Sequence, residues 1–183
     1  MKLLTLVFLI SSTVIYNSMG AIDELALDQL RVVTNLKNCL GGQMPSEKTR
    51  LVWVLRDFAL QLIDRNGCEL TANQYLEHCL EDVAGNGPEV RKKNEIRRSI
   101  RENLGKKSCF TLVRPTINEK DLVDLNGCKL RTEFVSEIEA IKEEVFSGRH
   151  EDLKKIDGCP LNGKLLSDLI EKCIAVINSN GLP

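Results

Sequence analysis

The sequence predicts an α/β fold with a mainly parallel sheet, covered by helices on both faces. Short apolar segments typical of strands alternate with longer segments whose apolar residues recur at helical spacing. The segment Leu51–Leu55 is apolar throughout, which is typical of a parallel strand buried on both faces. The 183 residues are enough for one domain with a buried core. We therefore expect a three-layer domain of helix, sheet and helix.

The N-terminal segment allows two interpretations. A basic residue, the apolar run Leu3–Ile10 and small residues before Ala21 fit a cleaved signal peptide, which predicts a secreted helical protein. The same residues fit a buried helix end over Leu3–Ile10 and a strand over Thr13–Tyr16, because strands of parallel sheets are apolar throughout. The residue pattern alone leaves both interpretations open.

The next elements follow from apolar spacing and capping residues. An apolar stripe from Ile22 to Leu36, with Asp23 as N-cap, predicts a helix that ends near Cys39. The strand over Leu51–Leu55 comes next along the chain, after a polar connection.

Further along, Thr71 caps a helix that we expect to end at Leu80, since Gln74 completes a capping box. The third expected strand is Cys109–Val113. Three more apolar stripes predict helices over Val90–Leu104, Thr132–Phe146 and Gly163–Asn178.

The charge balance gives no sign of a nucleic-acid binder. Twenty-five basic and 26 acidic residues give a formal net charge of -1. Glutamates are interleaved among the basic residues of the segment 90–104, which favours a solvated helix face over a nucleic-acid groove. These basic residues are Arg91, Lys92, Lys93, Arg97, Arg98 and Arg101.

The seven cysteines indicate free, mostly buried thiols rather than disulfides or a metal site. An odd number leaves at least one cysteine over in any disulfide framework. The two histidines do not stand at zinc-ligand spacing with paired cysteines. Free thiols favour a reducing compartment.

Charged residues end two of the three expected strands. Arg56 and Asp57 follow one of them, and Arg114, before Pro115, follows another. Ligands of doubly wound sheets bind beyond the carboxyl ends of the strands. By itself, however, an Arg-Asp pair at a strand end is more often a solvated or structural ion pair.

Several segments, in their order along the chain, resemble the guanylate-binding protein family of large GTPases. They are Ile10–Gly20 (ISSTVIYNSMG), Leu51–Phe58 (LVWVLRDF), Thr71–Glu77 and Cys109–Pro115. The resemblance covers nearly the whole chain and implies that residues 1–183 are the C-terminal part of an incomplete P-loop GTPase domain. It also implies a cytoplasmic protein in which the N-terminal apolar run is a core helix and strand.

The resemblance implies that Arg56 and Asp57 are the guanine-binding motif of the family. An ionised carboxylate only accepts hydrogen bonds, and guanine offers two adjacent donors, its ring N1–H and its exocyclic amine. Adenine presents an acceptor at the same ring position and would leave the carboxylate mispaired. Arg114 and Pro115 begin the loop 116–130, which takes the place of the family's guanine cap, a segment implied in dimerisation between G domains.

The phosphate-binding residues of such a domain are not found in this sequence. It contains no G-x-x-x-x-G-K-S/T loop, and the resemblance places the P-loop and the Mg²⁺-binding switch residues before Met1. We expect the intact protein to bind and hydrolyse GTP with Mg²⁺, and this chain alone to be inactive, with no catalytic or metal-binding residue of its own. The expected partners are a guanine nucleotide and a second G domain, with a membrane reached only indirectly through the parent protein. The alternatives are a non-catalytic fragment that pairs with a full-length relative, and the secreted helical protein.

Overall fold

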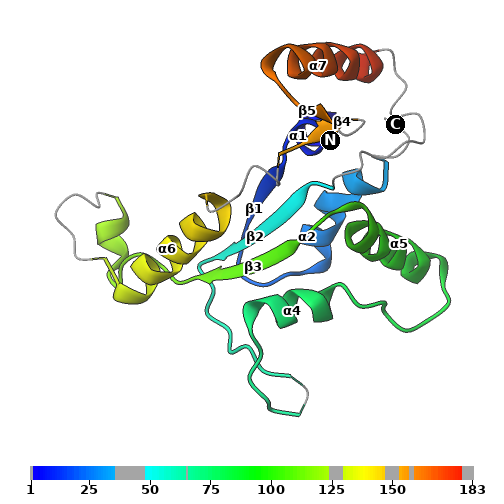
Figure 1. The fold of residues 1–183 in the computed structure, drawn as a ribbon. Helices are drawn as coiled ribbons and strands as arrows, with labels where there is room; N and C mark the ends of the chain where they lie inside the picture. Colours follow the sequence, from blue (N-terminus) through cyan, green and yellow to red (C-terminus); the bar gives the residue numbers. More distant parts are fainter. Residues whose placement is uncertain are drawn as a thin grey trace.

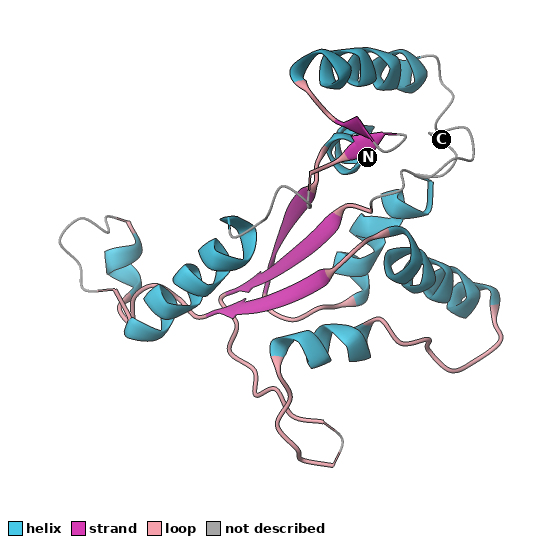
Figure 2. Cartoon of the chain, in the orientation of Figure 1, coloured by secondary structure: helices cyan, strands magenta, loops and turns pink. Residues whose placement is uncertain are grey.

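A three-stranded parallel sheet forms the centre of the computed structural model (Figure 1). The described residues are 2–35, 48–64, 66–123, 130–146, 153–156 and 159–178. The strands, in spatial order, are β1 (Thr13–Met19), β2 (Arg50–Arg56) and β3 (Lys107–Leu112). Helices cover both faces of the sheet (Figure 2), so the expected three-layer α/β fold is confirmed.

The central strand β2 supplies side chains to two hydrophobic cores. Successive residues of a strand point to opposite faces. Leu51, Trp53 and Leu55 are fully buried in the larger core, whereas Val52 and Val54 belong to the smaller one on the opposite face. Burial on both faces explains why this strand is apolar throughout.

The larger core lies under the N-terminal helix and the helices that connect the strands. Phe8, Leu30 and Ile100 are among its most buried side chains. The helices are α1 (Lys2–Ile10), α2 (Glu24–Gln29), the 3-10 helix η1 (Leu30–Asn35), α4 (Ala72–Cys79) and α5 (Pro88–Asn103). The N-terminal apolar run therefore forms the core helix and strand that the resemblance implies. Strand β1 is three residues longer than the predicted Thr13–Tyr16.

The smaller core is closed by α6 (Thr132–Phe146), which packs on β3 through Ile141. Its last turn is tied to the sheet by Glu144, whose carboxylate lies 2.8 Å from Arg50 Nη2 and accepts the Ser108 hydroxyl at 2.9 Å. Burial by itself would raise the pKa of Glu144, but hydrogen bonds from Lys106, Ser108 and Arg50 bring it below its ordinary value.

The C-terminal part of the described chain packs on α1. It contains the short antiparallel pair β4 (Lys155–Ile156) and β5 (Cys159–Pro160), followed by α7 (Gly163–Asn178). Helices α6 and α7 have the predicted bounds, whereas the two-residue strands carry no periodic pattern by which the sequence could predict them. No described helix has the length and apolar character needed to cross a membrane.

The helix expected from Ile22 to Leu36 is shorter than predicted. Asp23 caps it by accepting the Ala26 N–H at 2.8 Å, but α2 ends at Gln29 and the chain continues as η1. Residues three apart eclipse one another in a 3-10 helix, and Leu30 and Val33 are both fully buried in this way. The expected end near Cys39 lies outside the described residues.

The other predicted elements are present with small shifts at their ends. Thr71 and Gln74 form the expected capping box, with the Gln74 N–H donating to Thr71 Oγ1 at 3.2 Å. Helix α5 begins at Pro88, two residues earlier than predicted, because proline is well suited to the first turn. Strand β3 starts and ends slightly before the predicted Cys109–Val113.

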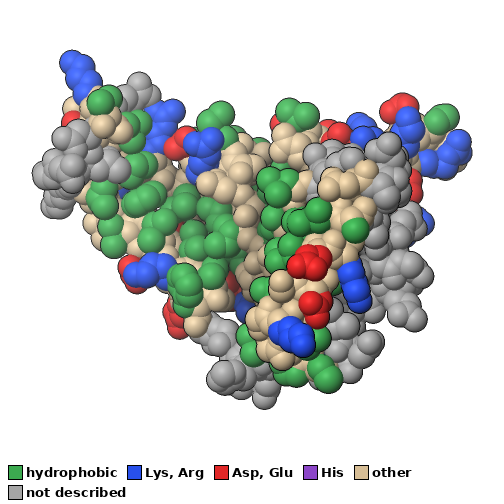
Figure 3. All heavy atoms as spheres, turned by 90° about the horizontal axis from the view of Figure 1, so that it is seen from above, with side chains coloured by type: hydrophobic (Ala, Val, Ile, Leu, Met, Phe, Trp, Pro, Cys, Tyr) green, Lys and Arg blue, Asp and Glu red, His purple; other side chains and the backbone are tan. Residues whose placement is uncertain are grey.

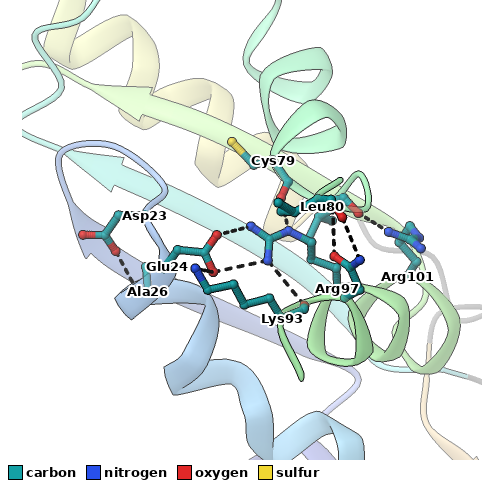
Figure 4. Close-up of polar contacts among 10 residues, drawn as sticks. Asp23, Glu24, Ala26, Cys79, Leu80, Lys93, Arg97 and Arg101 are labelled. Atoms are coloured by element: carbon teal, nitrogen blue, oxygen red, sulfur yellow. Dashed lines mark hydrogen bonds and ion pairs between the residues drawn. The ribbon is translucent and has the colours of Figure 1, made fainter. Parts of the chain in front are cut away.

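Arg97 corrects our interpretation of the basic face of α5. Its side chain is 5% exposed rather than solvated, and its guanidinium pairs with Glu24 of α2 and donates to the Cys79 carbonyl (Figure 4). Arg101 donates to the neighbouring Leu80 carbonyl. Helix C-termini leave carbonyls without partners, so these two arginines complete the end of α4 and join three helices.

The five described cysteines are free but not mostly buried, which corrects the second half of that prediction. Those described are Cys109 and Cys173, which are buried, Cys79, which is half-buried, and Cys68 and Cys159, which are exposed. Cys39 and Cys128 lie outside the described residues. Cys68 follows a tight turn in which Gly67 has a φ of +81°, and a turn of this kind lies at the surface.

The two edges of the sheet differ. Along the outer edge of β3, the Cys109 N–H donates to the Asn73 side chain at 2.7 Å. Just after the strand, the Val113 N–H donates to the Glu137 carboxylate at 3.0 Å. Along β1 no described strand pairs with the outer edge, and Ile15 is 51% exposed. Seen from above the view of Figure 1, the molecule shows a broad area of hydrophobic side chains (Figure 3). An unpaired apolar edge is a template for association.

We expect Arg97→Met to destabilise the protein by about 1–2 kcal/mol, because it removes hydrogen bonds to Glu24 and to the end of α4. Arg98→Met is the matched control, since the Arg98 side chain is 60% exposed. Urea unfolding at neutral pH measures both, and equal stabilities of the two variants would contradict a structural role for Arg97.

The same ion pair predicts a dependence of stability on acid. The hydrogen bond from Arg97 is the largest influence that lowers the pKa of Glu24. A depressed carboxyl pKa gives stability that is present above the ordinary value of 4.5 and is lost as the pH falls through the folded value. When the pH is lowered below 4.5, the free energy of unfolding of Glu24→Gln should therefore fall less than that of the wild type. Parallel pH curves would disprove this.

Because the outer edge of β1 is open, we expect the protein to self-associate through it, and a single charge introduced on this edge should reduce the association. Ile15→Lys should increase the monomer fraction, because lysine on an edge strand opposes pairing with another chain. Leu25→Lys, at a more exposed apolar site on α2, is the control and should have no effect. Light scattering after gel filtration gives the readout; identical behaviour of both variants would exclude the β1 edge.

Candidate functional site

The carboxyl edge of the sheet brings together residues that follow β2 and β3. Arg56 is in register with Leu112, so the residues after both strands meet at the same edge. Asp57 and Arg114 lie beside each other there, with Arg114 Nε 3.9 Å from Asp57 Oδ1. Their side chains are 31% and 49% exposed, so solvent screens the pair and it adds little stability. The structure thus unites two of the residues predicted for the site.

Asp57 has an unusual backbone conformation. Its φ is 54°, the only positive value at a non-glycine residue in the described part of the chain. Hydrogen bonds on both sides fix it: the Gly20 N–H donates to the Arg56 carbonyl at 2.8 Å, and the Phe58 N–H donates to the Leu112 carbonyl at 2.9 Å. Aspartate tolerates this region better than most residues, but it still costs roughly 1 kcal/mol. Such strain, held by the surrounding structure, clusters at functional sites.

Arg56 is placed differently from Asp57. It is the last residue of β2, exposed and in register with Met19 of β1. Among the described residues, its side chain forms no hydrogen bond or ion pair with Asp57 or Arg114. As the last residue of the central strand, Arg56 stands between Met19 of β1 and Leu112 of β3.

Pro115 begins a loop whose two ends are joined. The Arg131 N–H donates to the Pro115 carbonyl at 2.8 Å, just before α6 begins. Inside the loop, η2 (Glu119–Leu122) is capped by Asn118, which accepts the Lys120 N–H at 3.2 Å. Residues 124–129 of the loop lie outside the described chain.

The loop and the start of α6 line an open pocket of about 400 Å³. Asn118, Asp121 and Arg131 are among its polar lining residues. Ile117 and Val123 of the same loop are 88% and 92% exposed. Sequence reasoning assigned none of these residues, because no periodic pattern marks them and Arg131 meets Pro115 only when the loop closes.

A second groove, of about 490 Å³, lies on the other side of the strand ends. Apolar residues on either side of the turn at Gly67, together with residues of β3, line most of it. Phe58 belongs to this lining and directly follows Asp57. Within the described chain, no group of three or more histidine, cysteine, aspartate or glutamate side chains is arranged to hold a metal ion.

Comparisons with known proteins identify the family to which this chain belongs. The family model for the guanylate-binding protein N-terminal domain matches residues 1–155. The chain is 32% identical to rat guanylate-binding protein 2 over 194 aligned positions, which cover 97% of the chain and 32% of that protein. It is also 32% identical to human guanylate-binding protein 7, over 97% of the chain and 30% of that protein. The chain spans about a third of the length of these curated relatives. Because the family model matches most of the chain, this chain belongs to the guanylate-binding protein family.

Proposed function

We propose that this chain carries the guanine-recognising part of a GTPase domain, with Asp57 as the group that reads the base. The strained backbone of Asp57 at the carboxyl edge of a parallel sheet is the observation that carries the proposal. Membership of a guanylate-binding family gives the class of ligand.

The chemistry of Asp57 suits guanine. As an ionised carboxylate it accepts the N1–H and the exocyclic amine together, in a charge-assisted pair of hydrogen bonds. Arg114 supplies a positive charge 3.9 Å from the acceptor oxygen. Arg56, the last residue of the central strand β2, orients the edge on which the base lies. Adenine would leave this carboxylate facing an acceptor, and mispaired polar groups of this kind give discrimination of several kcal/mol.

Hydrolysis depends on residues that this chain does not supply. Phosphoryl transfer relies on a P-loop and on Mg²⁺ to position and stabilise the phosphates. The sequence has no G-x-x-x-x-G-K-S/T loop, and the described residues offer no group of metal ligands. We infer that residues 1–183 act as the C-terminal part of a GTP-hydrolysing domain and are inactive alone. The unpaired edge of β1 supports this inference, because it leaves room for the rest of a parallel sheet.

The expected partners follow from the loop after β3. Ile117, Leu122 and Val123 expose apolar side chains there, and this surface supports the proposal that a second G domain docks on the loop. The free thiols support a reducing, cytoplasmic location. We propose no contact with nucleic acid, and contact with a membrane only through the parent protein.

Asp57→Asn tests the assignment in a chimaera in which this chain replaces the matching segment of rat guanylate-binding protein 2. Asparagine tolerates a positive φ, so the backbone is retained while one acceptor becomes a donor. GTP affinity should fall about 10- to 100-fold, and affinity for xanthosine triphosphate should rise. Nucleotide titration monitored by fluorescence measures both constants.

Asp28→Asn, at an exposed site on α2, is the matched control and should leave both affinities unchanged. GTP binding that survives Asp57→Asn at full strength would remove Asp57 from the site.

A further inference from the structure

The described residues after α6 form a C-terminal strap, defined as residues 153–156 and 159–178, that lies across α1 (Figure 1). Helix α7 packs on α1 and places Cys173, 8% exposed, in the larger core together with Leu169. The match to the family's N-terminal domain ends at residue 155, within the first segment of the strap. The docked strap carries the chain from the sheet onto α1.

One side chain of the strap enters the protein at the amino end of the sheet. Lys154 is 6% exposed, and its ammonium donates to Thr49 Oγ1 at 2.7 Å, to the Phe8 carbonyl at 3.2 Å and to the Ser11 carbonyl at 3.3 Å. Its backbone N–H donates to Ser12 Oγ at 2.9 Å. The ammonium thus has a partner for each of its three protons.

The partners of this buried charge are all neutral. Within the described chain no carboxylate forms an ion pair with Lys154, and the charged residues next to its contacts are Lys48, Arg50 and Lys155. Arg50 is already paired with Glu144. Carbonyls at the C-terminus of α1 offer some compensation. Burial of the ammonium among these neutral groups is nevertheless costly, and it lowers the pKa of Lys154 to about 8.

We propose that the C-terminal strap is a releasable element, whose docking on α1 is weakened by burial of the Lys154 ammonium and tightens when that charge is removed. When the strap releases, the ammonium returns to water, which favours the released state at neutral pH. The Thr49 hydroxyl lies 2.8 Å from the Phe8 carbonyl and 3.0 Å from the Ser11 carbonyl, so its single proton can still serve one of the two carbonyls left behind. Removing the charge therefore relieves its burial at the cost of a hydrogen bond to one carbonyl.

The direction of the pH effect follows from the two states of the strap. In the released strap Lys154 keeps its ordinary pKa of 10.5, whereas in the docked strap its pKa is about 8. The released state binds the extra proton, so docking strengthens as the pH rises through this interval. Between pH 7 and pH 9 these values correspond to roughly tenfold tighter docking.

Two cysteines of the chain report strap release and global opening separately. Cys173 becomes accessible to a maleimide reagent when α7 leaves α1, whereas Cys109, 4% exposed in β3, requires opening of the main core. In the full chain at pH 7, Lys154→Met should slow labelling of Cys173 about tenfold or more and leave Cys109 unchanged. Lys164→Met, at an exposed site on α7, is the matched control and should change neither rate. Peptide mass spectrometry assigns the labelled thiol.

The wild type supplies a second test. Its Cys173 labelling rate, divided by the rate in urea at the same pH, should fall about tenfold between pH 7 and pH 9, and Lys154→Met should lack this fall. Faster labelling of Cys173 in Lys154→Met would mean that the ammonium holds the strap in place, which overturns the proposal. Equal changes at Cys173 and Cys109 would do the same. If Lys154→Met does not fold, a flat pH response of the wild type is sufficient to reject it.

Discussion

The burial of β2 between two strands and two layers of helices is the constraint on which the other features of this structure depend. Both of its edges are hydrogen-bonded, and its side chains enter a different core on each face. A strand in this position has no freedom to shift its register, because a slip of one residue would exchange the two cores. Its ends are therefore fixed points. Asp57 lies at one end, and Thr49, the partner of Lys154, lies at the other.

The fixed carboxyl end explains how a strained residue persists. The carbonyl before Asp57 is bound by Gly20 after β1, and the N–H after Asp57 is bound to Leu112 of β3. The backbone between them has to turn within one residue, and positive φ is the result. A strain of roughly 1 kcal/mol is small beside the burial of a whole strand, so the sheet holds the side chain in place before any ligand arrives.

The charged groups that join separate elements of the fold differ in their partners. Arg97 has a carboxylate partner and helix-end carbonyls, and Glu144 has two cations and a hydroxyl. Both groups join elements that have to stay together. Among the described residues Lys154 has neutral oxygens as partners, so its contact there is satisfied in hydrogen bonds but not in charge. This difference separates a permanent junction from one that can open.

The sequence by itself determined the α/β class, the three strands, the capping box at Thr71 and the bounds of α6 and α7, because periodicity and capping are local properties that act within a few residues. It also placed Arg56, Asp57 and Arg114 at the ends of strands, and the resemblance to a family implied a role for them. The contact between Asp57 and Arg114, the positive φ of Asp57 and the burial of Arg97 and Lys154 were decided only by the tertiary structure. Each of these depends on residues far apart in the chain, and no local pattern records which distant group will meet a side chain when the sheet and its helices pack together.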